Sequence, residues 1–572
     1  MTGSEGTGVV RDGRRVPPAD ADPPWATHGV PPADSNPPWA TPTDVPPWAQ
    51  PGLPGRPAAG EEPPAGAKPK RAAIGRQAGV GFVLFVVTFL VYWLLGPFNT
   101  PYDFQLSQAN NLIHGHLDMT EQYTKNLTIL ERVLYDGQGF CLPLNDPRGP
   151  EHDALIPNAR FSADCRHYMQ HSLGPAFMLV PLVVLFGPDI SQTLISALVG
   201  AFTAVIVYAI TRKFTSDLKT QLALTVMAMF GTTLWYSASD GSVWHFAHAT
   251  SVMFMFGAIW ATVNRRNALL AGALVGAAFM CRPSTILAGL FPLVAFADMW
   301  LVDEPGVPLL RRLRLRPLLA MAAGVAPFVL ATGAVNYLRF NNPFETGYSL
   351  SEQIYQTNLS SVYSNGIFDI SYISRHIPVV FEYMPIFGTE GSFVWPSYGG
   401  TALWLVSPAL LLAFFVHLRR YRTVALLGAL ALGLSAAVML FASFGQRLGI
   451  ISWSTSDLPF GLHLLPFWVL IGLAIALAVG LRDRIAVAAW VAIVAIAVAD
   501  WLFAATGWAQ FGYRYGLDFM PFLWLLAVMA VPRIKRWHVA LIGAAVLVNL
   551  WGILWVVKFG PAQLFGWTWV GW

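Results

Sequence analysis

Long apolar runs separated by short polar connectors dominate the chain from residue 77 onward. The first run covers residues 77–98 and is long enough to cross a bilayer, which takes about 20 apolar residues in a helix. Run lengths predict about thirteen such spans in all. After the first, they lie near residues 191–211, 219–238, 245–263, 267–281, 283–302, 318–338, 401–419, 423–443, 461–481, 484–505, 515–532 and 538–557. The pattern predicts an all-α polytopic membrane protein with a transmembrane domain over residues 76–558.

Two polar stretches are too long to be simple connectors and should carry structure of their own, residues 99–190 and 340–400. The end of the first, residues 171–187, is apolar but short and contains two prolines. We expect it to dip into the membrane as a juxtamembrane segment rather than cross it. A short Trp-rich segment, residues 559–572, closes the chain.

Residues 1–75 have a different composition, rich in Pro, Gly, Ala and Asp, with the near-repeats PPADADPPWAT and PPADSNPPWAT. Such a segment cannot bury a core, so we expect a disordered tail. Its Pro-Pro-Trp units could dock a partner in polyproline geometry, although a solvated spacer is the simpler interpretation. A secretory signal is not expected, because the first apolar run begins too late and is too long.

The placement of charge predicts orientation. Lys68, Lys70, Arg71 and Arg76 precede the first span, and later basic clusters such as NRRN and RRLRLR fall in alternate connectors. Because positive charge marks the cytoplasmic side, the tail is expected on the cytoplasmic side of the cell membrane and both long loops on the outer side. Charged residues make up 12% of the chain, about half the share in soluble domains. No nucleic-acid partner is expected, since the basic residues form short separated clusters.

Two of the three cysteines, Cys141 and Cys165, fall in the first long loop, and Cys281 lies near a later span end. If that loop lies outside the cytosol, a Cys141–Cys165 disulfide is expected. A metal pair is less favoured, because the spacing fits no usual zinc pattern.

The stretch TPYDFQLSQANNLIHGHLDMTE, residues 100–121, directly follows the first span. Its apolar residues recur at helical spacing and predict a helix lying on the membrane surface. They are Leu106, Ala109, Leu112, Ile113 and Leu117. Asp103 stands at the start, where a carboxylate either caps the helix or acts as the base of an enzyme that uses a lipid-borne substrate. The two roles are compatible.

Other ionisable residues cluster at the predicted outer ends of the spans. Charges at a membrane edge are costly and are therefore candidates for function. They are Asp240, His245, His248, Arg282, Arg447, His463, Arg514 and Asp518. Because these residues are expected at the same depth, at the outer edge of the membrane, they predict a cavity assembled from several helix ends. The three arginines suit a lipid phosphate, because the guanidinium fork matches phosphate oxygens, and the three histidines are weaker candidates.

Each of these residues also has a plainer interpretation. The arginines could snorkel to the interface or pair with an acid, as Arg514 and Asp518 could do across one helical turn. His248 could be a satisfied core histidine, and Asp240 a turn residue before Gly241. In the second loop four acids could bind an acceptor, and the sequence does not rank them. They are Glu345, Glu352, Glu382 and Glu390.

No cofactor is expected. The chain has no Gly-rich phosphate loop for a nucleotide. His114, His116 and Asp118 lie close enough in sequence to keep a divalent metal site open as a minor alternative.

Several motifs in order resemble the GT-C superfamily of integral-membrane glycosyltransferases, in particular the branch of protein O-mannosyltransferases and aminoarabinose transferases. They are YDFQLSQANNLIHGHLD, HSLGP, MCRPS, NYLRFNNPFETGY and FGYRYGLDFMPF, within residues 77–530. The match departs from that pattern in two places. Phe104 stands where many mannosyltransferases carry a second acid, and HSLGP lacks a basic residue found in some relatives. The Pro-rich tail suggests an actinobacterial source.

The resemblance implies transfer of a sugar from a polyprenyl-phosphate donor to an acceptor hydroxyl on the outer face of the membrane. The acceptor would be an envelope glycan, lipid or protein, Asp103 the general base, and direct displacement would invert the anomeric centre. Two alternatives stay open. A lipid or sugar transporter, or flippase, is disfavoured because the chain lacks detectable internal halves. A non-catalytic envelope scaffold would act through the Pro-Pro-Trp tail.

Overall fold

The apolar runs form helices, six of which are long and apolar enough to cross a membrane within the residues that the structure describes. These helices are α1 (Arg71–Leu95), α5 (Gln192–Phe214), α8 (Val243–Trp260), α12 (Leu315–Phe340), α18 (Arg484–Trp501) and α20 (Arg536–Ile553). The computed structural model describes residues 71–125, 132–146, 155–302, 308–357, 359–387, 394–395, 399–416, 483–507 and 510–555. The prediction of a largely helical polytopic membrane protein is confirmed.

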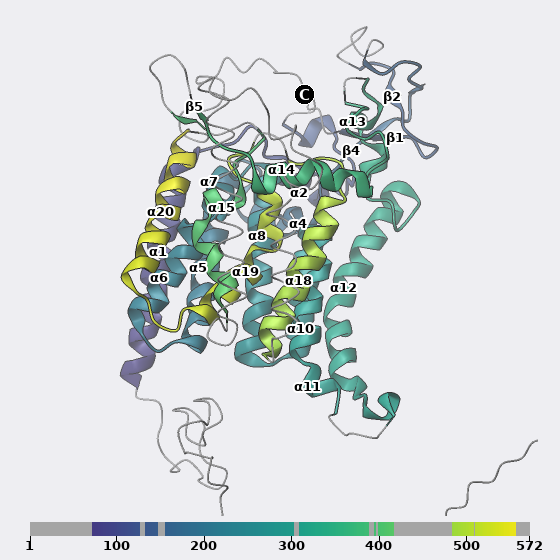
Figure 1. Cartoon of the computed structure of the whole chain (residues 1–572). Coiled ribbons are helices and arrows are strands. Elements are labelled where there is room, and N and C mark those ends of the chain that lie inside the picture. Colours follow the sequence, from purple (N-terminus) through teal and green to yellow (C-terminus); the bar gives the residue numbers. More distant parts are fainter. Residues whose placement is uncertain are drawn as a thin grey trace, which may run out of the picture. The chain divides into compact units, whose positions relative to one another are not determined.

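Shorter apolar helices fill the spaces between the long ones (Figure 1). They are α4 (Gly174–Phe186), α6 (Leu218–Phe230), α7 (Leu234–Asp240), α9 (Ala268–Cys281), α10 (Leu290–Ala295) and α19 (Met520–Ala530). The predicted juxtamembrane segment 171–187 is α4, a helix of 13 residues with Pro181 inside it. The predicted span 401–419 is instead the short helix α15 (Leu403–Val406) and a 3₁₀ segment, Pro408–Phe415.

Several predictions lie outside the described residues. They concern the tail over residues 1–70, the spans 423–443 and 461–481 with Arg447 and His463, Glu390, and the segment 559–572. The predicted count of thirteen spans therefore stays a prediction. The described residues from 76 onward belong to one compact unit, and of residues 1–75 the structure describes only the first residues of α1.

Close packing of small residues joins α9 to α12. A Cβ added to Gly272 would lie 2.1 Å from the carbonyl oxygen of Met321, and one added to Gly324 would lie 2.3 Å from that of Leu269. Glycine is needed at both positions because the two backbones touch, as is common where helices associate in a membrane. The contact holds the first half of α12 against the first half of α9.

The two long loops meet at one end of the helices, which we call the loop end (Figure 1). Strand β1 (Arg132–Tyr135) pairs antiparallel with β4 (Arg166–Met169), and Val133 also bridges to Ser351 of the second loop. The buried Arg132 side chain binds Asp146 at 2.8 Å and Glu352 at 3.2 Å. The short strands β2 (Leu142–Pro143) and β3 (Phe161–Ser162) pair in parallel.

A disulfide joins Cys141 to Cys165 within the first loop, with the two Cα atoms 5.8 Å apart. In the second loop, helix α14 (Ile373–Phe381) precedes the strand pair β5 (Ile386–Phe387) and β6 (Val394–Trp395). Since Val133 bridges to Ser351 and Arg132 binds Glu352, the two loops form one layer over the ends of the helices.

The stretch after the first span differs from its prediction. Helix α2 covers Phe104–Ile113, four residues shorter than the apolar spacing suggested, and its first eight residues are all buried. Four of them are amides that donate to carbonyls: Gln105 to Ser172, Gln108 to Leu117, Asn110 to Tyr123 and Asn111 to Ser107. The helix is thus buried in protein on all sides and does not lie on the membrane surface.

Candidate functional site

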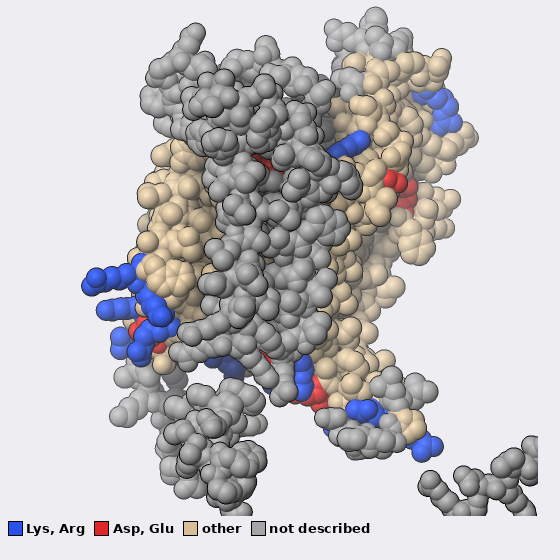
Figure 2. Space-filling model, in the orientation of Figure 1, with Lys and Arg blue, Asp and Glu red and all other residues tan. Residues whose placement is uncertain are grey.

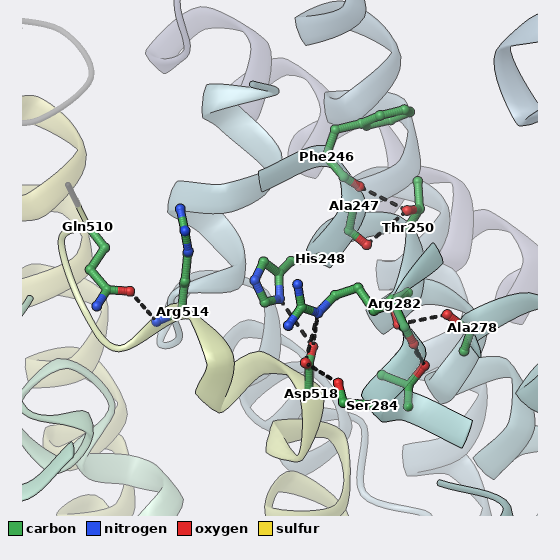
Figure 3. Close-up of polar contacts among 12 residues, drawn as sticks. Phe246, Ala247, His248, Thr250, Ala278, Arg282, Ser284, Gln510, Arg514 and Asp518 are labelled. Carbon is green, nitrogen blue, oxygen red and sulfur yellow. Dashed lines mark hydrogen bonds and ion pairs between the residues drawn. The ribbon is translucent and has the colours of Figure 1, made fainter. Parts of the chain in front are cut away.

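The carboxylate of Asp518 is the centre of a buried polar cluster at the loop end (Figure 3). Arg282 Nε donates to both of its oxygens, at 2.9 and 2.7 Å. The Ser284 hydroxyl donates to Oδ2 at 3.0 Å, and His248 Nδ1 lies 3.1 Å from Oδ1. Sequence analysis singled out three of these four residues, and the structure brings those three together from distant parts of the chain.

Local backbone breaks position the members of this cluster. Helix α9 ends at Cys281, Arg282 is extended at φ −148°, and Pro283 opens a 3₁₀ segment, Pro283–Gly289. Proline fits the first turn of a new helix but not the interior of α9. The chain therefore turns at MCRPS, which puts Arg282 and Ser284 at a helix end instead of on a lipid-facing surface. Asp518 ends a second 3₁₀ segment, Arg514–Asp518, which leads into α19.

A second acid adds to the cluster. Asp500, near the end of α18, is 4% exposed and interacts electrostatically with Arg282 and Asp518. Sequence analysis missed it, although an acid at a span end is the signal that identified the other candidates. Because the Asp518 carboxylate binds it directly, the positive charge of Arg282 is already balanced within the protein.

Arg514 is held differently from Arg282. Its backbone N–H donates to Gln510 Oε1 at 2.9 Å, and its guanidinium carbon lies 5.6 Å from the ring centre of Tyr515. Its buried Nε has no hydrogen-bond partner among the described residues. Figure 3 shows its side chain pointing in another direction from that of Asp518. The local pair between Arg514 and Asp518 does not form, because side chains four residues apart do not align in a 3₁₀ turn.

His245 and Asp240 form a second polar pair at the same end. Helix α7 ends at Asp240, and the φ of +65° at the next residue, Gly241, makes the tight turn predicted at Asp-Gly. Asp240 Oδ2 lies 2.8 Å from His245 Nδ1 and accepts from the backbone of Ser242 at 3.1 Å. Asp240 is therefore both a turn residue and the partner of a histidine.

His245 and His248 each bind a carboxylate through Nδ1 and leave Nε2 for a further partner. Both Nε2 atoms are buried and have no hydrogen-bond partner within the described part of the chain. Arg514 lies within electrostatic range of His248 and of Tyr236, whose ring packs 4.6 Å from that of His245. Three buried nitrogens without a hydrogen-bond partner among the described residues thus lie in the same region of the site. They are His245 Nε2, His248 Nε2 and Arg514 Nε.

Asp103 occupies the N-cap position of α2, but its side chain makes no capping hydrogen bond. The side chain is 16% exposed, and Lys125 Nζ lies 4.0 Å away. Burial raises the pKa of the Asp103 carboxyl, and Lys125 offsets part of that rise. The predicted cap role is therefore not observed, since the Asp103 side chain accepts no hydrogen bond from the first turn of α2.

Contacts of the neighbouring Tyr102 and Leu106 anchor Asp103 to the helix that carries the histidines. The carbonyl of Tyr102 accepts from the Val243 N–H at 2.9 Å, and the Tyr102 ring lies 5.0 Å from that of Trp244. Gln192 accepts from Leu106 N–H at 3.0 Å and donates to the Gly241 carbonyl at 2.8 Å. Asp103 is thus fixed at the start of α8, and His248 lies about 7.5 Å further along that helix axis.

The structure distinguishes the acids of the second loop. Glu352 is buried against Arg132, and Glu345 binds the Gly347 N–H at 2.7 Å and the Ser349 hydroxyl at 2.6 Å. Both have structural partners. Glu382 is half-buried, its Oε1 has no hydrogen-bond partner among the described residues, and burial raises its pKa to about 7. Sequence gave no means of choosing it from the four.

The residues considered for a metal do not converge. His116 Nδ1 lies 3.6 Å from Asp118, whereas the His114 ring stacks on Tyr123 with centres 3.9 Å apart. In the described ranges, no three His, Cys, Asp or Glu side chains are grouped so that they could hold an ion.

Fold and site together define a polytopic helical membrane protein with buried charged side chains gathered at one end of its helices. Neither a protein-family model nor a curated protein matches the chain. Among solved structures, it is similar to the crystal structure of ArnT from Cupriavidus metallidurans bound to undecaprenyl phosphate. The identity is 13% and the TM-score 0.35, over 82% of this chain and 61% of that one. At this distance the match does not bear on the activity.

Proposed function

We propose that the protein is a GT-C glycosyltransferase that moves a sugar from a polyprenyl-phosphate donor to an acceptor hydroxyl at the outer face of the cell membrane. One observation carries the proposal: the Asp103 carboxylate caps nothing, yet it is fixed against the start of the helix that carries His245 and His248. A half-buried carboxylate with a raised pKa, with Lys125 as its nearby cation, suits a general base.

The chemistry follows from these positions. Asp103 accepts the proton of the acceptor hydroxyl as its oxygen forms a bond to the anomeric carbon. The bond from that carbon to the phosphate oxygen breaks, and polyprenyl phosphate leaves with the electron pair. Attack from the face opposite the phosphate inverts the anomeric centre. The step needs a base on one side and a cation on the other.

We assign the donor phosphate to Arg514, with His245 and His248 as the neighbouring donors. Arg514 has a buried Nε without a hydrogen-bond partner among the described residues, whereas Arg282 is held by Asp518. We therefore give Arg282 and Asp518 a positioning role, in which they orient His248. Arg447 and His463 keep their proposed role at the phosphate, although both lie outside the described residues.

Glu382 is our candidate on the acceptor side. The neighbouring Tyr383 packs against Gly399, whose carbonyl accepts from Gln510, and Gln510 in turn binds the Arg514 backbone. A hydroxyl-rich acceptor would supply the partner that the Glu382 carboxylate lacks within the described residues.

Two features support an outer location for this site. Figure 2 shows Lys and Arg side chains gathered at the lower end of the helices, opposite the loop layer and where α12 begins in Figure 1, with fewer over the loop layer itself. Positive charge favours the cytoplasmic side. The Cys141–Cys165 disulfide also suits a loop exposed to an oxidising compartment.

A donor panel tests the proposal directly. Membranes containing the protein are incubated with radiolabelled polyprenyl-phosphate sugars and, separately, with nucleotide sugars after depletion of endogenous polyprenyl phosphate. We expect label transfer and release of polyprenyl phosphate only with a lipid-linked donor. Arg514→Gln should raise the donor KM about tenfold or more, and Arg514→Lys less, because lysine keeps the charge but loses the fork. Movement of labelled lipid across the membrane without cleavage would instead favour a transporter.

A further inference from the structure

Helix α12 ends in a turn that folds back along the helix. Asn341, directly after Phe340, has a left-handed backbone with a φ of +55°, which reverses the chain. Pro343 then lies beside Gly333, because a Cβ added to that glycine would lie 3.7 Å from the Pro343 Cβ. The Asn336 side chain also donates to the Pro343 carbonyl, at 3.4 Å. The turn therefore returns about 6–10 Å along the helix axis.

Hydrogen bonds within residues 341–347 hold this shape. Asn342 accepts from the Phe344 N–H through Oδ1 at 3.0 Å and from the Glu345 N–H through its carbonyl at 3.2 Å. The Glu345 carboxylate accepts from the N–H of Gly347 at 2.7 Å. Backbone groups that approach lipid need such partners within the protein, because the hydrocarbon offers none. The turn is therefore suited to a position at the edge of the bilayer.

The turn displays one large apolar side chain. Phe344 is 90% exposed, more than any other large apolar residue of the described chain. A single exposed apolar residue is ordinary on a surface that faces water. This turn, however, lies against α12, which stands at the edge of the helices in Figure 1 and has only 6% of its apolar window buried. Leu330 and Leu338 of that helix are 71% and 69% exposed, so the surface beside the turn is one that faces lipid.

The level of the turn coincides with the expected edge of the bilayer. Arg316, near the start of α12, and Asn336 are 20 positions apart, and no charged residue lies between them. About 20 helical residues cross the hydrocarbon core, so α12 leaves the core at the loop end near Asn336. Pro343 binds Asn336 and lies at that level. The next residue, Phe344, is therefore placed where a side chain reaches the lipid chains.

We propose that residues 341–345 form a membrane anchor, in which the Phe344 ring is buried in the leaflet at the loop end. The partner of this surface is the bilayer itself. Gly347, at the end of the turn, packs so closely on β1 that an added Cβ would lie 3.3 Å from the Val133 side chain. The anchor thus holds the loop layer at a fixed height over the membrane. The proposal does not depend on the transfer reaction proposed above.

Photocrosslinking to lipid tests the anchor in the full-length protein. The photoreactive residue p-benzoylphenylalanine replaces Phe344, and the protein is reconstituted in phosphatidylcholine vesicles with a trace of radiolabelled phosphatidylcholine. The same residue in place of Leu338 reports a lipid-facing position of α12, and in place of Phe161 it reports an exposed ring of the first loop. We expect labelling from position 344 within about threefold of that from 338 and at least about tenfold above that from 161.

Two results would overturn the proposal. Lipid labelling from position 344 no stronger than from position 161 would mean that the turn lies in water. A photoproduct of twice the protein's mass in place of labelled lipid would mean that the ring meets a second copy of the chain. Because the Phe344 ring is 90% exposed, its replacement removes little packing, and an unchanged melting temperature checks that the variant is folded. Turnover is not measured, so failure of the proposed function leaves this test unaffected.

Discussion

Arg282 Nε lies 2.9 and 2.7 Å from the two carboxylate oxygens of Asp518, although 236 residues separate them in the chain. The contact joins the end of α9 to the start of α19 and fixes the carboxylate on which His248 also converges. A buried ion pair contributes little net stability compared with an apolar replacement, but losing one partner leaves the other charge uncompensated. The main effect of the pair is therefore to fix the end of α9 against the start of α19 at the site.

Removal of one member of this pair should cost more than removal of both. We expect Asp518→Asn to destabilise the protein by about 3–5 kcal/mol, because Arg282 and His248 lose their anion. In Arg282→Gln/Asp518→Asn the loss should be smaller than the sum of the single losses by about 1–3 kcal/mol. Thermal unfolding in detergent, carried through the double-mutant cycle, measures both. Additive losses would mean that the pair does not couple.

Lys125 should set the acid limb of the pH–activity profile. Its charge lowers the pKa of Asp103, which burial raises, and the base must be ionised to accept a proton. Activity is therefore lost as pH falls through the pKa of Asp103. In Lys125→Met that pKa rises further, so the acid limb should move to higher pH, whereas Lys125→Arg should leave it near the wild-type position. A limb that stays in place in Lys125→Met would contradict this role.

Glu382 should make the free energy of unfolding fall as pH rises, whereas a salt-bridged acid makes it rise. Its pKa is raised from 4.5 to about 7 in the folded protein, so the folded state binds more protons than the unfolded state between those values. Stability then falls as pH rises through this window. Glu382→Gln should be more stable than wild type at pH 8, by about 1–3 kcal/mol, and equal to it near pH 4.

Melting curves at the two pH values check this expectation, with Glu345→Gln as the control, because that acid is satisfied by Gly347 and Ser349. If Glu382 also serves the acceptor, the stabilised variant should have a higher acceptor KM, a trade-off expected of binding-site charges. A gain in stability of equal size at both pH values would mean that ionisation of Glu382 is not the cause.

The disulfide offers a test of orientation. If residues 99–190 lie outside the cytosol, Cys141 and Cys165 should be oxidised in cells, and Cys281, which is buried, should be the one thiol that reacts with maleimide-polyethylene glycol after denaturation. Prior reduction should raise the number of labelled thiols to three, the total in the chain. Three labelled thiols without reduction would place this loop in a reducing compartment.

The helical membrane architecture was predictable because apolar run length is a local property of the chain. The turn at Asp240 and Gly241 was predictable for the same reason, since Asp-Gly followed by a new apolar run is a local signal. The charged candidates that the structure describes lie at one end of the helices, as the alternating direction of the spans led us to expect, while Arg447 and His463 lie outside the described residues.

What the sequence did not reveal depends on partners distant in the chain. Helix α2 has apolar periodicity, yet its amides are buried because carbonyls of other segments satisfy them. A pair between Asp518 and Arg514 within one turn was one of the interpretations left open, but the 3₁₀ backbone turns Asp518 toward Arg282. Glu382 stands out only once its lack of a partner within the described residues is visible.

The most direct test of Asp103 as the base is the rate of sugar transfer from a polyprenyl-phosphate donor by Asp103→Asn, compared with wild type and with Asp164→Asn, the same change at an exposed loop position. Asparagine keeps the size of the side chain but cannot take the acceptor proton. We predict a fall of about a hundredfold or more for Asp103→Asn at unchanged melting temperature, and none for Asp164→Asn. Turnover by Asp103→Asn at the wild-type rate would contradict the assignment.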